Sequence, residues 1–208
     1  MTTHHPRQFP VILITGTPGT GKTLHATLLT SLLADSPTPL THIDIGQLVK
    51  TRGFHEGFDE EWQSYTVDED RLLDYLEEVL NPEEAPAGTG FVIDHHDPSL
   101  FPERWIDLAV CLTADNGVLH ERLTARNYPP AKLTENLTAE IMLTCLTETR
   151  ESYAPELIVE LTSNGEGEDV DENVRRIGDW VEAWVRDRKE GVHGEEGEDG
   201  EGGEGGEA

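Results

Sequence analysis

The sequence predicts an α/β fold in which helices cover both faces of a five-stranded parallel sheet, giving a three-layer α/β/α arrangement. Three observations lead to this prediction. Five short apolar runs alternate with segments of helical periodicity along the chain. The first run leads directly into a glycine-rich segment and then a helix, which is the setting of a phosphate-binding loop. A length of 208 residues suits one such domain.

The expected elements follow in chain order. The strands are predicted at residues 11–14, 41–45, 91–94, 108–112 and 157–161. We expect a helix from Lys22, two helices between 47 and 80, one over 117–126, a long one over 134–153 that begins at Thr134, and a last one over 173–188. Prolines and glycines mark residues 81–90 as a loop. Ligands of such sheets bind where the strands end, which is where the glycine-rich segment lies.

The segment from Gly16 to Thr23 reads Gly-Thr-Pro-Gly-Thr-Gly-Lys-Thr and matches G-x-x-x-x-G-K-[ST] at every fixed position. Its glycines let backbone N–H groups surround a phosphate, and the N-terminus of the following helix adds positive potential. We expect Lys22 to bridge the β- and γ-phosphates of ATP, and Thr23 to offer its hydroxyl to Mg²⁺. A chance match is disfavoured because a buried strand precedes the motif and a leucine stripe follows it. The predicted nucleotide-binding residues of this P-loop NTPase fold are Gly16, Pro18, Gly19, Thr20, Gly21, Lys22 and Thr23.

Asp94 ends the third predicted strand, and two histidines follow it. A carboxylate in this position can orient Mg²⁺ or its waters opposite Thr23, which makes Asp94 a candidate catalytic residue; the alternative is a cap for the next turn. Because side chains alternate along an extended chain, His96 rather than His95 should share the side of Asp94. His96 is therefore a second catalytic candidate, and a structural role in a surface turn is its alternative.

Basic residues are few, so each one is informative. Arg104 lies between two predicted strands and is a candidate for a bidentate phosphate contact, with a surface ion pair as the alternative. Arg122 and Arg126 are four residues apart on one predicted helix and face the same way, so a transferring phosphate between them would relieve their repulsion. Arg126 is the third catalytic candidate. The polar segment 127–132 is predicted to be a lid that excludes water.

The formal net charge is −27, which argues against direct, stable nucleic-acid binding because such binding relies on clustered lysines and arginines. A basic protein is a more plausible partner. Eight of the negative charges lie in residues 190–208, which leaves −19 on residues 1–189. Cys111 and Cys145 form neither a metal motif nor a disulfide framework. No run of about 18 apolar residues and no apolar leader is present, so we expect a soluble intracellular protein without a membrane span.

Several segments taken together resemble the adenylate kinase isoenzyme 6 family, also called coilin-interacting nuclear ATPases. The resemblance covers roughly residues 10–188, and its order and spacing around a P-loop make it specific. Besides the P-loop, the segments that carry it are Gly57-Phe58-Asp59-Glu60-Glu61, Asp68-Glu69-Asp70-Arg71, Asp94-x-His96, Phe101-Pro102-Glu103-Arg104-Trp105, Arg126-x-Tyr128 and Ser152-Tyr153.

The resemblance implies a nucleoside monophosphate (NMP) kinase fold with an NMP-binding part at about residues 46–80 and a short lid at about 126–133. It implies transfer of a phosphoryl group from ATP to AMP, giving two ADP, together with ATP hydrolysis that depends on Mg²⁺. It further implies a role in maturation of the small ribosomal subunit and its rRNA. The partner would be a basic small-subunit ribosomal protein, and the location would be nucleus and cytoplasm.

The resemblance also assigns roles to single residues. Asp94 and His96 would orient Mg²⁺ and the attacking water, Arg126 would serve the lid, and Arg104 would clamp the AMP phosphate. Ser163 and Asn164 look like the turn that contacts adenine. Lys50 is a departure, because many adenylate kinases have an arginine there and lysine lacks the planar fork. Weaker acceptor binding is the expected consequence.

Residues 190–208 are rich in glycine and glutamate and are predicted to be a disordered tail beyond a kinase-like domain at 1–189. Two other functions fit the same motifs. One is a purely metabolic nucleoside monophosphate kinase, and the other is a P-loop kinase for a different small acceptor.

Overall fold

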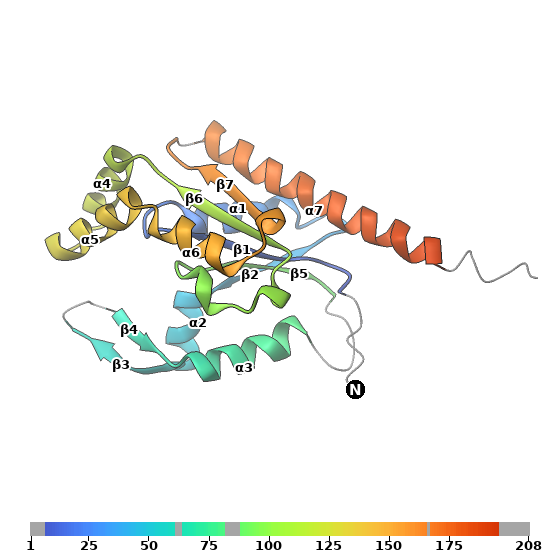
Figure 1. Ribbon diagram of the computed structural model, residues 1–208, viewed down its shortest axis with the longest axis horizontal. Coiled ribbons are helices and arrows are strands. Elements are labelled where there is room, and N and C mark those ends of the chain that lie inside the picture. Colours follow the sequence, from blue (N-terminus) through green and yellow to red (C-terminus); the bar gives the residue numbers. More distant parts are fainter. Residues whose placement is uncertain (1–6, 61–63, 82–87, 166, 196–208) are drawn as a thin grey trace, which may run out of the picture.

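The protein is described here by a computed structural model that covers residues 7–60, 64–81, 88–165 and 167–195. Its centre is a sheet of five parallel strands in the order β2-β5-β1-β6-β7 (Figure 1). The strands are β1 (Val11–Gly16), β2 (Leu40–Asp44), β5 (Gly90–Asp94), β6 (Leu108–Thr113) and β7 (Ile158–Thr162). The predicted fold class and all five predicted strands are confirmed.

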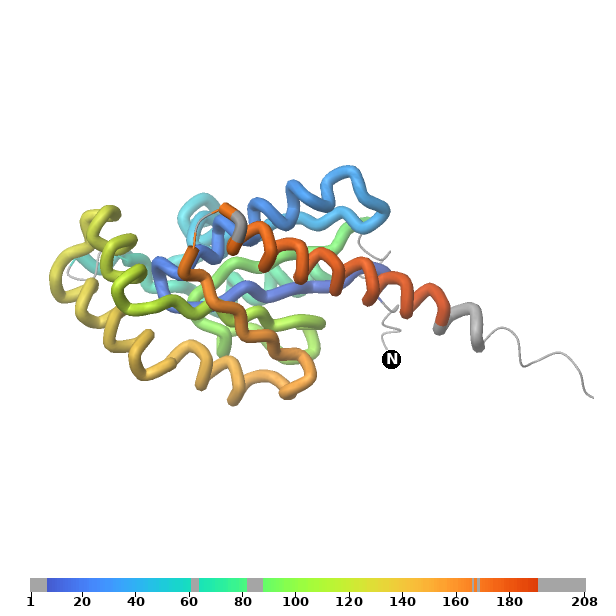
Figure 2. The backbone as a smooth tube through the Cα atoms, turned by 90° about the horizontal axis from the view of Figure 1, so that it is seen from above, coloured from blue at the N-terminus to red at the C-terminus, as the bar shows by residue number. Residues whose placement is uncertain are grey.

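Helices cover both faces of the sheet, as its sequence requires. Every residue of β1 is buried, and a strand with two buried faces reads as a continuous apolar run. Figure 2 shows α1 (Lys22–Leu32) and α7 (Glu168–Glu195) on one side and α6 (Thr144–Ser152) on the other. Ile12 and Ile14 of β1 pack with α1 and α7, whereas Val11 and Leu13 pack with α2 (Ile45–Arg52) and α3 (Glu69–Leu80). The alternation of side chains along β1 thus divides the core into two halves.

The region between β2 and β5 differs from the prediction of two helices over residues 47–80. It holds α2, a two-stranded antiparallel hairpin of β3 (His55–Asp59) and β4 (Ser64–Val67), and then α3. Gly53, with φ of +69°, ends α2, and the Asp68 side chain accepts the Arg71 N–H at 3.2 Å where α3 begins. The hairpin strands are short and largely exposed, so they lack the apolar alternation that would have revealed them.

The predicted long helix over 134–153 is in fact two helices, and the start at Thr134 is wrong. α5 (Pro130–Ile141) begins at a proline, which suits the first helical position because its missing N–H has no partner there in any case. Thr134 lies inside α5, where its Oγ1 donates to Pro130 O at 2.9 Å. Leu143 has φ of +51°, and this left-handed residue separates α5 from α6. α4 (Asn116–Ala125) agrees with its prediction within one residue.

The C-terminal helix is longer than predicted at both ends. α7 runs from Glu168 to Glu195, so residues 190–195 of the predicted disordered tail are helical. Residues 196–208 lie outside the described residues, as do residues 82–87 of the predicted loop at 81–90. Three short 3₁₀ turns, Pro98–Leu100, Glu103–Trp105 and Pro155–Leu157, complete the elements of the described chain. None of the helices in this part of the chain is long and apolar enough to span a bilayer.

Candidate active site

The P-loop connects β1 to α1 at the edge of the sheet where the parallel strands end (Figure 1). Gly16, Gly19 and Gly21 have φ of +141°, +102° and +98°, a backbone region that is costly for residues with a Cβ. A Cβ on Gly19 would also lie 2.6 Å from Leu119 Cδ1 on α4, which is closer than real contacts allow. The glycines of the motif therefore determine both the path of the loop and its close packing against α4.

The predicted nucleotide-binding residues divide into two groups. Gly16 and Thr20 lie behind the wall of the cleft and shape the loop. Thr20 is fully buried, and its N–H and Oγ1 both donate to Thr17 O, at 3.2 and 2.9 Å. The remaining members of the set line the cleft directly: Pro18, Gly19, Gly21, Lys22 and Thr23.

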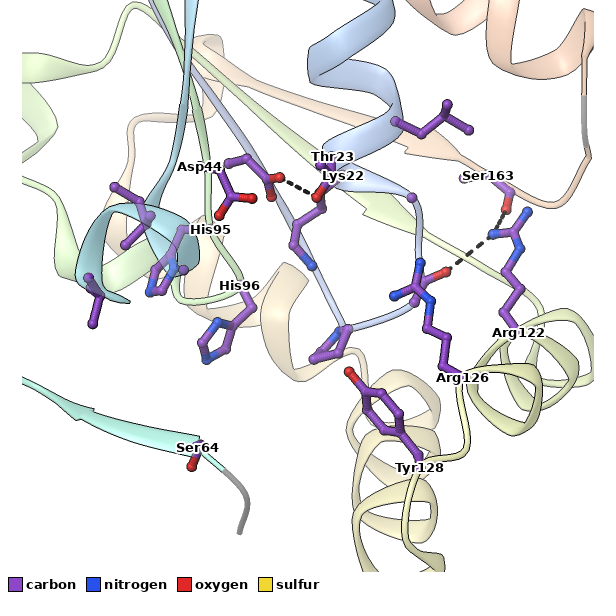
Figure 3. Close-up of a pocket in the computed structure, with 18 of the residues that line it drawn as sticks. Lys22, Thr23, Asp44, Ser64, His95, His96, Arg122, Arg126, Tyr128 and Ser163 are labelled. Carbon is purple, nitrogen blue, oxygen red and sulfur yellow. Dashed lines mark hydrogen bonds between the residues drawn. The ribbon is translucent and has the colours of Figure 1, made fainter. Parts of the chain in front are cut away.

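Lys22 reaches into the space enclosed by the loop (Figure 3). Its Nζ donates to Gly16 O at 2.8 Å and to Thr17 O at 3.3 Å. Burial lowers the pKa of this ammonium group, and the positive charge of Arg126 acts in the same direction, whereas Asp94 opposes them. The loop thus holds a desolvated cation where phosphates are expected, so a phosphate anion would relieve an existing electrostatic cost.

Thr23 and Asp94 meet at the start of α1. Thr23 Oγ1 donates to Asp94 Oδ2 at 2.5 Å, and Asp94 is 5% exposed. Burial favours the neutral carboxyl, but the nearby His42 ring, the hydrogen bond from Thr23 and the charge of Lys22 outweigh it and lower the pKa of Asp94. The carboxylate is therefore ionised at neutral pH.

These two residues fit Mg²⁺ of a bound nucleotide. A hydroxyl that donates to a carboxylate keeps its lone pairs for a cation, and Mg²⁺ prefers one or two protein oxygens together with phosphates and waters. Thr23 and Asp94 would hold the ion, which when bound neutralises charge on the β- and γ-phosphates. Within the described residues, no group of three or more His, Cys, Asp or Glu side chains is arranged to hold a metal without such help.

His95 and His96 both line the cleft, which corrects the expectation that only His96 would share the side of Asp94. The alternation rule fails because β5 ends at Asp94. His95 is buried, with its ring 4.5 Å from that of His96 and 5.8 Å from that of Phe101. Burial and the neighbouring His96 lower the pKa of His95 to about 3, so it is neutral. Desolvation and then Lys22 lower the pKa of the more exposed His96.

Arg122 and Arg126 do not share one role. Arg122 donates to the carbonyls of Ser163 at 2.8 Å, Gly165 at 3.1 Å and Gly19 at 3.4 Å, so it ties the P-loop to the segment after β7. Arg126 lies across the P-loop from His95 and His96 and lines the cleft (Figure 3). The described residues give its guanidinium no carboxylate partner. Arg126 is therefore available for a phosphate, whereas Arg122 is structural.

Arg104 is not part of this cleft. Its Nη2 donates to Glu77 Oε2 on α3 at 2.7 Å, and its side chain is 65% exposed. Trp105 Nε1 donates to the same carboxylate oxygen at 2.6 Å. The surface ion pair is thus correct for Arg104, and the assignment as an AMP phosphate clamp is wrong for the structure as it stands. A pair with Glu77 was not visible in the sequence because the two residues are 27 positions apart.

Of the two residues predicted to contact adenine, Ser163 lies in the cleft and Asn164 has a structural role. Ser163 is buried and lines the cleft beside Gly165 and Val170, so it remains a candidate for contact with the base. The Asn164 side chain instead accepts the Asp115 N–H at 2.7 Å and fixes the start of α4. Leu24, which is 52% exposed, also lines the cleft, whereas the sequence predicted it only as a member of the leucine stripe that follows the P-loop.

The cleft has a volume of about 1080 Å³. That is slightly above the range of about 300–1,000 Å³ for small-molecule sites. Opposite the P-loop it is lined by α2, including Lys50, and by the hairpin, including Phe58 and Tyr65. The rings of Phe58 and Tyr65 are 5.0 Å apart and nearly edge-on, and Phe58 is 48% exposed. In the sequence, the signal for this aromatic wall was Gly57-Phe58, which is part of a segment that resembles the adenylate kinase isoenzyme 6 family.

Comparisons with known proteins agree with this geometry. A profile of the AAA domain family matches residues 12–143. The chain is 46% identical over 180 residues to an adenylate kinase isoenzyme 6 homolog of Schizosaccharomyces pombe, covering 86% of this chain and 96% of that protein. Another homolog with this name, from Saccharomyces cerevisiae, is 40% identical over 189 residues, with 91% and 90% covered.

Solved structures resemble the chain in fold alone. A shikimate kinase from Bacteroides thetaiotaomicron superposes with a TM-score of 0.53 at 17% identity, covering 84% of this chain and 99% of that one. A gluconokinase from Sinorhizobium meliloti gives a TM-score of 0.50 at 14% identity, covering 88% and 97%. The fold and the cleft define a P-loop kinase. At the identities found over most of its length, the chain belongs to the adenylate kinase isoenzyme 6 family.

Proposed function

We propose that this protein transfers the γ-phosphoryl group of ATP to AMP, giving two ADP, and that it also hydrolyses ATP. The observation that carries the proposal is a single cleft shared by two different walls. One wall is a P-loop with its lysine, and the other is α2 with the hairpin. Lys22 reaches from the P-loop wall toward the space that His96 and Arg126 also line, where a transferring phosphoryl group would pass.

The donor end of the cleft suits ATP. The P-loop receives the phosphates, and the base lies toward Ser163, Val170 and Leu24. In the transfer, the bond between the γ-phosphorus and the ADP oxygen breaks, and a bond to an oxygen of the AMP phosphate forms. Such reactions depend on positioning and charge stabilisation, which Lys22 and Arg126 supply from opposite sides.

The acceptor end suits a nucleoside monophosphate. Lys50 offers a cation for its phosphate, and the exposed ring of Phe58 offers a surface on which a base can stack. Base–aromatic stacking is worth about 1–3 kcal/mol. Lysine provides a point charge and not a fork, and Arg104 is engaged elsewhere, so weak acceptor binding is part of the proposal.

The same site gives ATP hydrolysis when water takes the position of the acceptor. Asp94, His95 and His96 line the cleft at the end of β5, and we assign the positioning of this water to Asp94 and His96. His96 is largely neutral because desolvation lowers its pKa, so its ring can accept a proton or a hydrogen bond from water.

The products distinguish this function from its alternatives. ADP formed from AMP and inorganic phosphate released from ATP should be measured side by side with Mg²⁺, using AMP, CMP, UMP and no acceptor. We expect ADP formation with AMP to exceed phosphate release, and CMP and UMP to be poorer acceptors. Phosphate release that is indifferent to AMP would overturn the kinase assignment in favour of an ATPase. Transfer to shikimate or gluconate in preference to AMP would identify a kinase for another small acceptor.

The proposal also includes a role in small ribosomal subunit and rRNA maturation, in nucleus and cytoplasm, through a basic small-subunit ribosomal protein. Its support is the family membership together with a charge of −19 on residues 1–189. Carboxylates on this surface can take the place of RNA phosphates and speed the approach of a basic protein. The charge also argues against stable direct binding to nucleic acid.

Salt dependence tests this second part. Binding of a basic small-subunit ribosomal protein should weaken between low and physiological salt, because exposed charges are screened beyond about 8–10 Å there. A chain that ends at residue 189 should bind somewhat more slowly and keep the same kinase activity. Binding that ignores salt would contradict the electrostatic account, and no binding by either chain would leave a metabolic kinase as the function.

A further inference from the structure

His42 lies beside the carboxylate that faces Thr23, on the neighbouring strand. β2 and β5 pair in parallel, with His42 opposite Val92 and Asp44 opposite Asp94. The Nε2 atom of His42 is 3.7 Å from Asp94 Oδ2. That oxygen is the one that accepts the hydrogen bond from Thr23 Oγ1. Asp94 Oδ2 is therefore approached by α1 from one direction and by β2 from another.

The Nε2 atom of His42 has a second unusual property. It is buried and has no hydrogen-bond partner at normal distance among the described residues. An unpartnered buried polar atom costs about 1–3 kcal/mol, and such atoms in native proteins require an explanation. A relative movement of about 0.7 Å would bring Nε2 to the usual N–H···O distance of about 3.0 Å from Asp94 Oδ2.

We propose that His42 is a positioning residue for phosphoryl transfer, whose ring donates its Nε2–H to Asp94 Oδ2 and fixes the direction of that carboxylate. A carboxylate held by Thr23 alone can rotate about χ2, since that torsion has a broad minimum. A second donor from β2 defines the plane of the carboxylate, and with it the direction in which the other oxygen, Oδ1, faces the cleft.

The surroundings fit this role. Asp94 is 5% exposed, so few other groups compete for its oxygens. The side chain of His42 is 20% exposed. It lies on β2, the edge strand of the sheet, whose pairing with β5 holds the backbone of His42 beside that of Asp94. His42 is also absent from the wall of the cleft itself. It therefore acts through Asp94 and does not touch the nucleotide.

The inference rests on the proposed function, because it assigns Asp94 a part in phosphoryl transfer. It has a test that needs no activity, however. In nucleotide-free protein, ¹⁵N resonances of the His42 ring report which nitrogen carries the proton. We expect the Nε2–H tautomer, with an Nε2 resonance that shifts when Asp94 is replaced in Asp94→Asn. An Nδ1–H tautomer, or an Nε2 resonance that ignores Asp94→Asn, would overturn the proposal even if the protein is an active kinase.

Kinetics then measures the consequence. His42→Leu should lower kcat about tenfold, or about 1.4 kcal/mol, with the KM for ATP changed by less than about twofold. His42→Gln, which can place a donor near the Nε2 position, should recover most of this loss. Thr41→Ala is the matched control, because Thr41 is exposed on the same strand and its side chain has Thr89 Oγ1, at 3.3 Å, as its hydrogen-bond partner in the described part of the chain. It should behave as the parent protein.

A double-mutant cycle separates positioning from general damage to the sheet. His42→Leu combined with Asp94→Asn should be no slower than Asp94→Asn alone, since His42 acts only through that carboxylate. An independent tenfold loss in the Asp94→Asn background would refute the coupling. If the parent protein shows no transfer to AMP, the proposed function fails. The NMR result still decides whether His42 and Asp94 are hydrogen-bonded.

Discussion

Replacing Lys22 with methionine should abolish ATP binding while changing the stability of the nucleotide-free protein very little. Two opposing effects make up this prediction. The substitution removes hydrogen bonds from Nζ to Gly16 O and Thr17 O, at 2.8 and 3.3 Å. Bonds to charged groups contribute about 1.5–3 kcal/mol each. Thr17 O nevertheless keeps its two bonds from Thr20, so only one carbonyl loses its side-chain donor.

The opposing effect is desolvation. Burial is the largest influence on Lys22, and it lowers the pKa of the ammonium group despite the attraction of Asp94. The folded protein therefore disfavours this charge relative to the unfolded chain, and an isosteric apolar side chain removes that cost. We expect the two effects to cancel to within about 1 kcal/mol, which is about 2–4 °C in Tm for a chain of this length.

Thermal unfolding with and without Mg²⁺ and ATP measures both parts. At a ligand concentration about 100 times Kd, the parent protein should gain about 2.7 kcal/mol. With about 2–4 °C per kcal/mol, its Tm should rise by about 5–11 °C. The Lys22→Met protein should show no such rise. An equal rise in both proteins would refute the P-loop assignment, and a nucleotide-free Tm about 10 °C below the parent would show that Lys22 is mainly structural.

Two further predictions follow from side-chain partners. Arg104→Ala should leave the KM for AMP within about twofold, because Arg104 pairs with Glu77 outside the cleft. Lys50→Ala should raise the KM for AMP about tenfold or more, with little change in the KM for ATP. Steady-state kinetics with both substrates measures these values, and the reverse pattern would restore Arg104 as the acceptor clamp. His25 donates from Nδ1 to Gly21 O at 2.9 Å, and burial lowers its pKa below the unfolded value of 6.5. Between these two pKa values the unfolded chain binds more protons than the folded protein, so the free energy of unfolding falls as the pH is lowered. His25→Gln should flatten this dependence in urea unfolding at pH 7 and pH 5, and equal slopes for both proteins would contradict the assignment.

The sequence predicted the sheet and the P-loop well because both have strong local signals. A parallel strand buried on two faces is a continuous apolar run, and β1 is such a run. The glycine spacing of the P-loop reflects backbone geometry that few other residues tolerate. Asp94 was predicted for a similar reason. It ends an apolar strand beside the P-loop, and few residues at such a strand end can face the phosphates.

The rest depended on contacts between distant segments. The bond from Arg104 to Glu77 and those from Arg122 to Ser163 and Gly165 span 27 to 43 residues, and residue type alone does not distinguish a free arginine from a paired one. The hairpin was missed because exposed strands lack apolar alternation. His42 was missed because its proximity to Asp94 comes from the pairing of β2 with β5.

If one cleft holds a donor and an acceptor nucleotide end to end, it should also hold a single molecule in which five phosphates join two adenosines. Isothermal titration measures this binding directly. We expect one molecule bound per chain, displaced by ATP and by AMP, with binding weakened by Lys22→Met at one end and by Lys50→Ala at the other. Binding that only ATP displaces, and that Lys50→Ala leaves unchanged, would show that the cleft has no acceptor site.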